Sequence, residues 1–145
     1  DASGDPVKRV DAGYYFLFEH QLTGEAGGSA RRATGFLRYG HANASINAVE
    51  HSLQTGVTVS APFTGRSNDE AGIGVTVAKL GDKYRQVATN AGDPAPVTEL
   101  IYELSYRAAI TDWLAIHPDV QWIRYRGDAS LNDAWAVTLR MEAGF

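Results

Sequence analysis

Side chains that could do covalent chemistry are present, but they do not fall into the spacing of a known catalytic or metal-binding motif. Four histidines occur on separate parts of the chain, without the grouping that zinc ligands show: His20, His41, His51 and His117. Asp69 and Glu70 stand in a turn-forming stretch, which favours a solvated cap or Asx-turn over a catalytic dyad. Ser60 and Ser105 lack histidine and aspartate partners in a recognisable motif. The sequence therefore predicts no catalytic residue, no metal and no cofactor.

The composition limits the classes of protein to which the chain could belong. Its 145 residues are enough for one domain, and the absence of cysteine excludes disulfides and thiolate metal sites. A net charge of −4 argues against a nucleic-acid-binding surface, which needs clustered lysine and arginine. No run of about 18 apolar residues occurs, so no transmembrane helix is predicted. The start of the chain lacks the apolar core of a signal peptide, which predicts a mature chain or a piece of a longer one.

The end of the chain alternates between apolar side chains and small or polar ones. The apolar set ends on an aromatic residue: Val137, Leu139, Met141, Ala143 and Phe145. Period-two alternation predicts a β-strand with one apolar and one polar face. A final strand of this kind is typical of an outer-membrane β-barrel, in which alternate side chains contact lipid and the lumen.

The same alternation recurs along the chain and predicts seven strands in all. Their expected ranges are Gly13–Leu22, Ala33–His41, Glu50–Ala61, Gly72–Leu80, Val97–Ile110, Trp113–Arg124 and Ala136–Phe145. The fifth is longer than most soluble strands and suits a tilted membrane strand that extends beyond the bilayer. Pro118 cannot donate to a ladder, so a bulge or a locally unpaired position is expected there. The predicted fold class is all-β, an antiparallel transmembrane β-barrel.

The connections between the predicted strands alternate in length, as they do in bacterial outer-membrane barrels. With the chain terminus on the periplasmic side, the short Thr111-Asp112 connection is also periplasmic and the long Gly81–Pro96 connection lies outside. Pro62–Ala71 is long for a periplasmic turn and fits this scheme less well. Tryptophan and tyrosine residues near the predicted strand ends are consistent with aromatic girdles at the two bilayer interfaces.

Three segments resemble the carbohydrate-selective porin family of Gram-negative outer membranes. The first is Gly35-Phe-Leu-Arg-Tyr-Gly-His-Ala42, and the second, from Ala61 to Val77, is similar to that family's Pro-Gly-Arg-x-x-Asp turn and Gly-x-Gly-Val strand. The third, from Glu99 to the end, is the most specific because it contains Trp113-Leu, a short spacer and then Pro118-Asp-Val-Gln-Trp122. One departure is Arg124-Tyr-Arg-Gly-Asp128, where relatives commonly carry a Pro-Gly-Gly turn.

The resemblance implies a larger barrel than these residues can form alone. Family members have about sixteen strands, whereas seven are predicted here. Residues 1–145 are therefore expected to be the C-terminal segment of a single outer-membrane β-barrel domain. An open set of strands would leave two unpaired edges in lipid, so the remaining strands must come from the rest of the protein or from another chain. The implied function is passive diffusion of carbohydrates and other small polar solutes across the bacterial outer membrane, in contact with lipid and without enzymatic activity.

In such a channel, selectivity depends on the side chains that line the lumen. The residue alternation places these candidates on the lumen side: Arg38, Glu99, Glu103, Arg107, His117, Asp119, Gln121, Arg140 and Glu142. Their mixed charges and hydrogen-bonding groups suit the hydroxyls of neutral sugars, with Glu103–Arg107 and Asp119–Arg140 as the foremost candidate pairs. The alternative is that these side chains form a solvated barrel wall and pair across strands without contacting substrate.

Two other classes of function remain open from the residues. A soluble small β-barrel or β-sandwich could bind a ligand in its mouth, in which case both faces of some strands would be buried from water. An outer-membrane enzyme or a structural partner in a secretion assembly would require a polar catalytic cluster, which the sequence does not display. A porin would need detergent to stay folded in solution, whereas a soluble barrel or sandwich would not. Conductance across a bilayer would distinguish a porin from an outer-membrane enzyme or structural partner.

Overall fold

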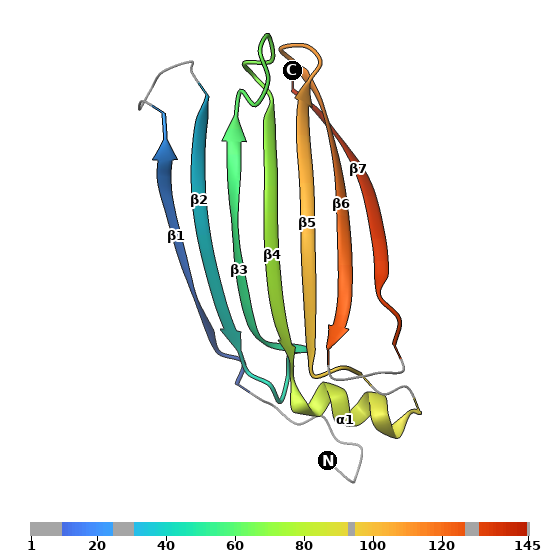
Figure 1. Cartoon of the computed structure of the whole chain (residues 1–145). Coiled ribbons are helices and arrows are strands. Elements are labelled where there is room, and N and C mark those ends of the chain that lie inside the picture. The colour runs from blue at the N-terminus through green and yellow to red at the C-terminus, as the bar shows by residue number, and fades with distance from the viewer. Residues whose placement is uncertain (1–9, 25–30, 93–94, 127–130, 145) are drawn as a thin grey trace.

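Seven antiparallel strands form one sheet in which their spatial order is the same as their order in the chain (Figure 1). The computed structural model describes residues 10–24, 31–92, 95–126 and 131–144. The strands are β1 (Gly13–Thr23), β2 (Arg32–Ala42), β3 (Val49–Ser60), β4 (Glu70–Leu80), β5 (Thr98–Ala109), β6 (Leu114–Arg126) and β7 (Ala134–Ala143). Each predicted strand is therefore present, close to its predicted bounds. Of the Arg124–Asp128 departure from the family pattern, Arg124 to Arg126 are part of β6, whereas Gly127, Asp128 and also Phe145 lie outside the described residues.

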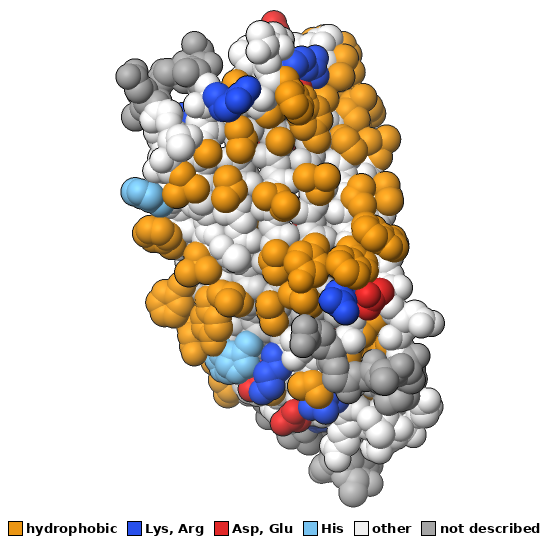
Figure 2. Space-filling model, viewed as in Figure 1, with side chains coloured by type: hydrophobic (Ala, Val, Ile, Leu, Met, Phe, Trp, Pro, Cys, Tyr) orange, Lys and Arg blue, Asp and Glu red, His pale blue; other side chains and the backbone are white. Residues whose placement is uncertain are grey.

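One face of the sheet, termed here the outer face, is apolar along every strand, and Figure 2 shows its hydrophobic side chains gathered over the strands. Val137 and Leu139 are 74% and 73% exposed, so no other part of the described chain covers them. Cross-strand register stacks Trp122 on Tyr102 and on Trp135, with ring centroids 5.5 and 5.9 Å apart. An exposed apolar surface that extends over a whole sheet needs an apolar environment.

The opposite face, termed the inner face, carries mostly small and polar side chains at the intervening positions, together with larger apolar ones such as Tyr15, Leu17 and Phe36. The buried hydrophobic side chains of the described residues are few: Ala78, Leu80 and Ala115. A soluble sandwich requires a second layer that encloses a core of inward-facing side chains. The described strands form one layer only, which argues against the soluble sandwich considered from the sequence.

A short helix, α1 (Asp82–Asn90), lies in the connection between β4 and β5, at the end of the sheet opposite the C-terminus (Figure 1). The sequence predicts only a long connection in this stretch, so the helix is an addition to the prediction. Asp82 lies in its first turn, where a negative charge suits the helix dipole, and accepts a hydrogen bond from Arg85 Nη1 at 3.2 Å. None of its nine residues is buried, although Tyr84, Val87 and Ala88 recur at helical spacing. No helix among the described residues has the length and apolar character needed to span a membrane.

Pro118 interrupts one of the two ladders made by β6. On the β7 side, Pro118 is paired with Leu139 and the register is continuous. On the β5 side, the pairing passes from Ser105–Asp119 directly to Ala108–Ile116 in unchanged register. The unpaired stretch of the β5–β6 ladder includes Pro118, which has no backbone N–H to donate to β5. Of the two expected outcomes, the locally unpaired position is confirmed.

The connection between β3 and β4 is fastened to β5 by a buried carboxylate. Asp69 is only 3% exposed. Its oxygens accept hydrogen bonds from Arg66 Nε at 2.6 Å, from the Ala109 backbone N–H at 2.9 Å and from the Tyr106 hydroxyl. The expectation of a solvated cap at Asp69 is therefore wrong, because the long turn folds back onto β5 and encloses the side chain. This clasp also explains how a ten-residue stretch can serve as a compact turn.

Removing the Asp69 carboxylate should destabilise this end of the sheet. In the Asp69→Ala variant, the Tyr106 hydroxyl and the Ala109 N–H would lose their acceptor while remaining half-buried. Each buried donor left without a partner costs on the order of 1–3 kcal/mol. We expect urea unfolding of the membrane-reconstituted protein that contains this segment to shift to lower urea concentration. Asp112→Ala, a matched change at an exposed aspartate in the neighbouring turn, should leave the midpoint unchanged.

The same comparison should depend on pH in a defined direction. Burial by itself would raise the pKa of Asp69, but hydrogen bonds from Tyr106, Ala109 and Arg66 outweigh it and hold the pKa below the ordinary value of 3.8. A lowered folded-state pKa stabilises the fold above the unfolded-state value, and the contribution is lost as pH falls through the folded-state value. The stability difference between the wild type and Asp69→Ala should therefore be constant near neutral pH and shrink below about pH 3.8. A difference that grew on acidification would contradict the clasp.

Candidate functional site

The residues predicted to face the lumen all lie on the inner face of the sheet. The register continues in rows across the middle of every strand pair and shifts only near strand ends, between Gln21 and Thr23 and between Val49 and His51. Parity assigned within one strand therefore carries over to its neighbours. The middle row is Glu19, Phe36, Gly56, Gly74, Glu103, Gln121 and Ala136. The next rows on this face, two, four or six residues away along each strand, contain the remaining candidates. The inner face is therefore the candidate functional site.

The side-chain pairs on this face run across strands, not along them. Gln121 Nε2 donates to Glu103 Oε2 at 2.9 Å, and Arg107 Nε donates to Glu142 Oε2 at 2.9 Å. The expected Glu103–Arg107 pair is not formed, because residues four apart on one strand are separated by about 13 Å. Strands next to each other are only about 5 Å apart, which brings Gln121 on β6 within reach of Glu103 on β5. The long Arg107 side chain instead reaches past β6 to Glu142 on β7.

The expected Asp119–Arg140 pair is also replaced by a direct cross-strand contact. Thr138 lies opposite Asp119 in the β6–β7 register, and its hydroxyl donates to the Asp119 carboxylate. Arg140 lies opposite His117, one row further along. Asp119 is buried by this arrangement, whereas Arg140 remains exposed on the inner face. Of this pair, Arg140 is the side chain that a solute could contact.

Charged groups concentrate on the inner face at the end that carries the β5–β6 turn. Glu142 accepts the hydrogen bond from Arg107 and lies 3.9 Å from His117 Nδ1. The His117 Nδ1 atom is buried and has no hydrogen-bond partner among the described residues. Glu70 lies opposite Arg107 in the β4–β5 register. This end of the face presents both signs of charge close together.

The middle of the inner face is hollowed because glycine replaces larger residues there. A Cβ at Gly56 would meet the Phe36 ring at 2.8 Å, so the ring packs directly against this glycine. A Cβ at Gly74 would meet Thr55 O at 3.5 Å and the Phe36 ring at 3.8 Å, which are ordinary contact distances. The hollow has a volume of about 160 Å³, and its lining includes Phe36, Arg38, Gln54, Gly74, Thr76, Glu103 and Ser105. Donors, acceptors and an aromatic ring therefore surround one depression.

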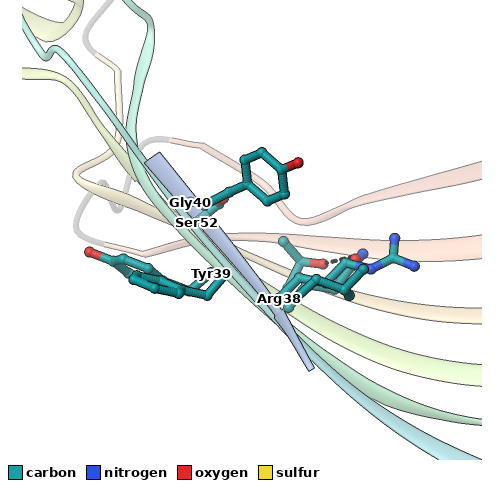
Figure 3. Close-up of a pocket in the computed structure, with 9 residues that line it drawn as sticks. Arg38, Tyr39, Gly40 and Ser52 are labelled. Atoms are coloured by element: carbon teal, nitrogen blue, oxygen red, sulfur yellow. Dashed lines mark hydrogen bonds between the residues drawn. The ribbon is translucent and has the colours of Figure 1, made fainter. Parts of the chain in front are cut away.

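A second hollow of about 460 Å³ adjoins the first on the side of β1, and the two share Arg38, Gln54 and Thr76. Figure 3 shows Arg38 and Tyr39 projecting to opposite sides of the sheet, as their alternation requires. The Arg38 guanidinium lies over the Phe36 ring, 5.3 Å from its centroid, and 3.7 Å from Glu19. Gln54 Nε2 donates to Thr76 Oγ1 at 3.2 Å. Arg38 thus stands where the two hollows meet.

Several residues of this site were not singled out from the sequence. Tyr15 and Leu17 project from β1 over the larger hollow, and Tyr15 is 81% exposed. Both faces of β1 carry aromatic residues, so alternation within that strand could not assign them. Phe36 and Gln54 had the correct parity, but their importance depends on the glycines of neighbouring strands. Among the described residues, no group of three or more histidine, cysteine, aspartate or glutamate side chains could hold a metal ion.

Comparison with known proteins adds an independent line of evidence. Residues 2–145 match the family described as carbohydrate-selective porin, OprB family. Porin B of Pseudomonas aeruginosa is 28% identical over 147 residues, which cover 92% of this chain and 32% of that protein. The high-pH structure of Pseudomonas putida OprB has the same fold, with a TM-score of 0.73 at 23% identity, covering 92% of this chain and 35% of that one. This chain therefore spans about a third of the length of these relatives. Because the family match extends over nearly all of its residues, the chain belongs to the OprB family of carbohydrate-selective porins.

Proposed function

We propose that this chain forms part of the wall of an outer-membrane porin through which carbohydrates and other small polar solutes diffuse passively. The observation that carries the proposal is the opposite chemistry of the two faces of one unlayered sheet. The outer face is apolar and exposed over all seven strands, which suits contact with lipid. The inner face bears charges and hydrogen-bonding groups, which suit a water-filled lumen.

We further propose that the chain is the C-terminal portion of one barrel of about sixteen strands. The sheet is open, so β1 and β7 each have one edge whose backbone groups lack partners within the described strands. In a bilayer those groups must be paired, because lipid supplies no hydrogen bonds. The missing strands would come from the remainder of a longer protein, as the threefold greater length of the relatives suggests. In this arrangement the C-terminus and the β5–β6 turn are periplasmic, and α1 lies outside.

The proposed mechanism requires no covalent step and no energy input. A sugar presents hydroxyls that both donate and accept hydrogen bonds. Arg38 can donate to them, Glu103 can accept from them, and Gln54 can do both. The exposed ring of Tyr15 offers an apolar surface against which a sugar ring can pack. Since every contact is made beside water, each is weak enough to be released as the solute moves on.

The basic test is the behaviour of the full-length protein in membranes. We expect a compact species in detergent whose gel mobility changes on heating, and a steady ionic conductance in planar bilayers. Addition of a neutral sugar should reduce that current as the sugar occupies the lumen. A protein that stayed folded and monomeric without detergent would instead support the soluble ligand-binding alternative. A membrane-inserted protein without conductance would favour a structural role.

Arg38 should contribute to solute contact without contributing to the fold. In Arg38→Gln the charge at the junction of the two hollows is lost, and one hydrogen bond to the sugar is weakened. A net hydrogen bond contributes about 0.5–1.5 kcal/mol, so the apparent sugar affinity from current block should fall about two- to tenfold. Arg124→Gln makes the same change in charge on the outer face, beside Trp122, and should leave the block unaltered. An equal effect of both variants would show that the overall charge, and not the site, is responsible.

Filling the central hollow should slow sugar passage while leaving the barrel intact. Gly74→Leu would project a side chain from the inner face into the space of about 160 Å³. Gly74→Ala adds only a Cβ at ordinary contact distances and serves as the matched control. We expect liposome-swelling rates with sugars to fall severalfold for Gly74→Leu and to change little for Gly74→Ala. Unchanged heat-dependent gel mobility would establish that both variants fold, and equal swelling rates for both would place the hollow outside the solute path.

A further inference from the structure

His41 and His51 meet on the outer face at the α1 end of the sheet. They lie ten residues apart in the sequence but are directly paired in the β2–β3 register. Their Nδ1 atoms are 3.3 Å apart and their ring centroids 4.7 Å apart. Their separation in the sequence predicts scattered histidines, and for this pair that prediction is wrong because the register places them side by side.

The separation of the two nitrogens matches the geometry of a shared metal ion. Imidazole nitrogens bind Zn²⁺ at about 2.0–2.1 Å in tetrahedral sites, which places two such nitrogens about 3.3 Å from each other. Imidazole also suits Cu²⁺ and Ni²⁺. An ion could therefore bind both rings with little change in the positions of the two strands.

The groups around His51 leave its Nδ1 atom available as a ligand. Glu50 Oε1 lies 3.2 Å from His51 Nε2, and Lys79 Nζ lies 2.7 Å from Glu50 Oε2. A carboxylate that accepts the Nε2–H places the lone pair of the ring on Nδ1, and metal-binding histidines are commonly oriented in this way. The Tyr39 hydroxyl lies 2.8 Å from the same Nδ1, where it can donate to that lone pair. His51 retains 35% of its side-chain exposure, so an ion can reach it.

We infer that His41 and His51 form a binding site for a divalent transition metal ion such as Cu²⁺ or Zn²⁺. Without the ion, His51 Nδ1 is hydrogen-bonded to the Tyr39 hydroxyl and to His41 Nδ1, and the ion replaces both of these contacts. The protein supplies two imidazoles, and water or the Tyr39 oxygen completes the coordination. Glu50, held by Lys79, orients His51. The bound ion cross-links β2 to β3 at the end of the strands. This site is on the opposite face from the proposed solute path and does not depend on that function.

The direct test uses Cu²⁺ alone, titrated into the full-length protein in detergent and followed by electron paramagnetic resonance. We expect one equivalent to bind with hyperfine coupling to two imidazole nitrogens. His41→Gln and His51→Gln should each remove one nitrogen from the spectrum and weaken binding. Glu50→Gln should keep both nitrogens but weaken binding about tenfold or more, since it removes only the orienting carboxylate.

Two histidine variants serve as matched controls. His20 lies on the outer face of β1, where its ring stacks on Phe18, and His117 lies on the inner face. His20→Gln and His117→Gln should both retain the two-nitrogen signal. Absence of that signal in the wild-type protein would overturn the inference, whether or not any variant folds. Its loss in either control, with folding verified by heat-dependent gel mobility, would equally overturn the assignment to His41 and His51.

Discussion

Every feature of this chain depends on the requirement that backbone N–H and C=O groups be paired by neighbouring strands where no water is available. An extended ladder satisfies this requirement, and its pleat sends successive side chains to opposite faces. The separation into an apolar outer face and a polar inner face follows directly. Because the register is unbroken across most of the sheet, the division made in one strand extends over all seven. The exposed Val137, Leu139 and Met141 side chains of β7 thus follow from the alternation of the sheet and are not a defect in packing.

The same ladder decides which polar side chains interact. Neighbours across strands are far closer than residues of equal parity along one strand, so Glu103 pairs with Gln121 on the adjacent strand, and Arg107 reaches across β6 to Glu142. The Arg107–Glu142 ion pair partly neutralises charge at the wall, whereas Arg140 remains exposed. The row that contains Gly56 and Gly74 removes side-chain volume from the centre of the inner face, and Phe36 packs against it. Shape and charge on this face therefore arise from rows across the sheet, each built from residues distant in the sequence.

The two ends of the sheet are organised differently. At the end with the C-terminus, the Asp69 carboxylate ties the β3–β4 turn to β5 and makes a long connection compact. At the other end, α1 occupies the connection between β4 and β5 without burying a side chain. The histidine pair lies at this second end, on the outer face. A buried carboxylate stabilises one end, whereas a metal ion that cross-links β2 to β3 would stabilise the other.

The sequence by itself determined the seven strands, the two faces of all but the first and the resemblance to sugar porins, because period-two alternation and short motifs are local properties of the chain. The candidates that it predicts to line the lumen share one face of the sheet, and their contact with solute stays a prediction. Only the tertiary structure decided the partners of Glu103, Arg107 and Asp119, since these depend on register between strands. The burial of Asp69, the hollow beneath Phe36 and the meeting of His41 with His51 have the same origin. Helix α1 also escaped prediction: Tyr84, Val87 and Ala88 recur at helical spacing, but the pattern extends over only nine residues within a long connection between two strands.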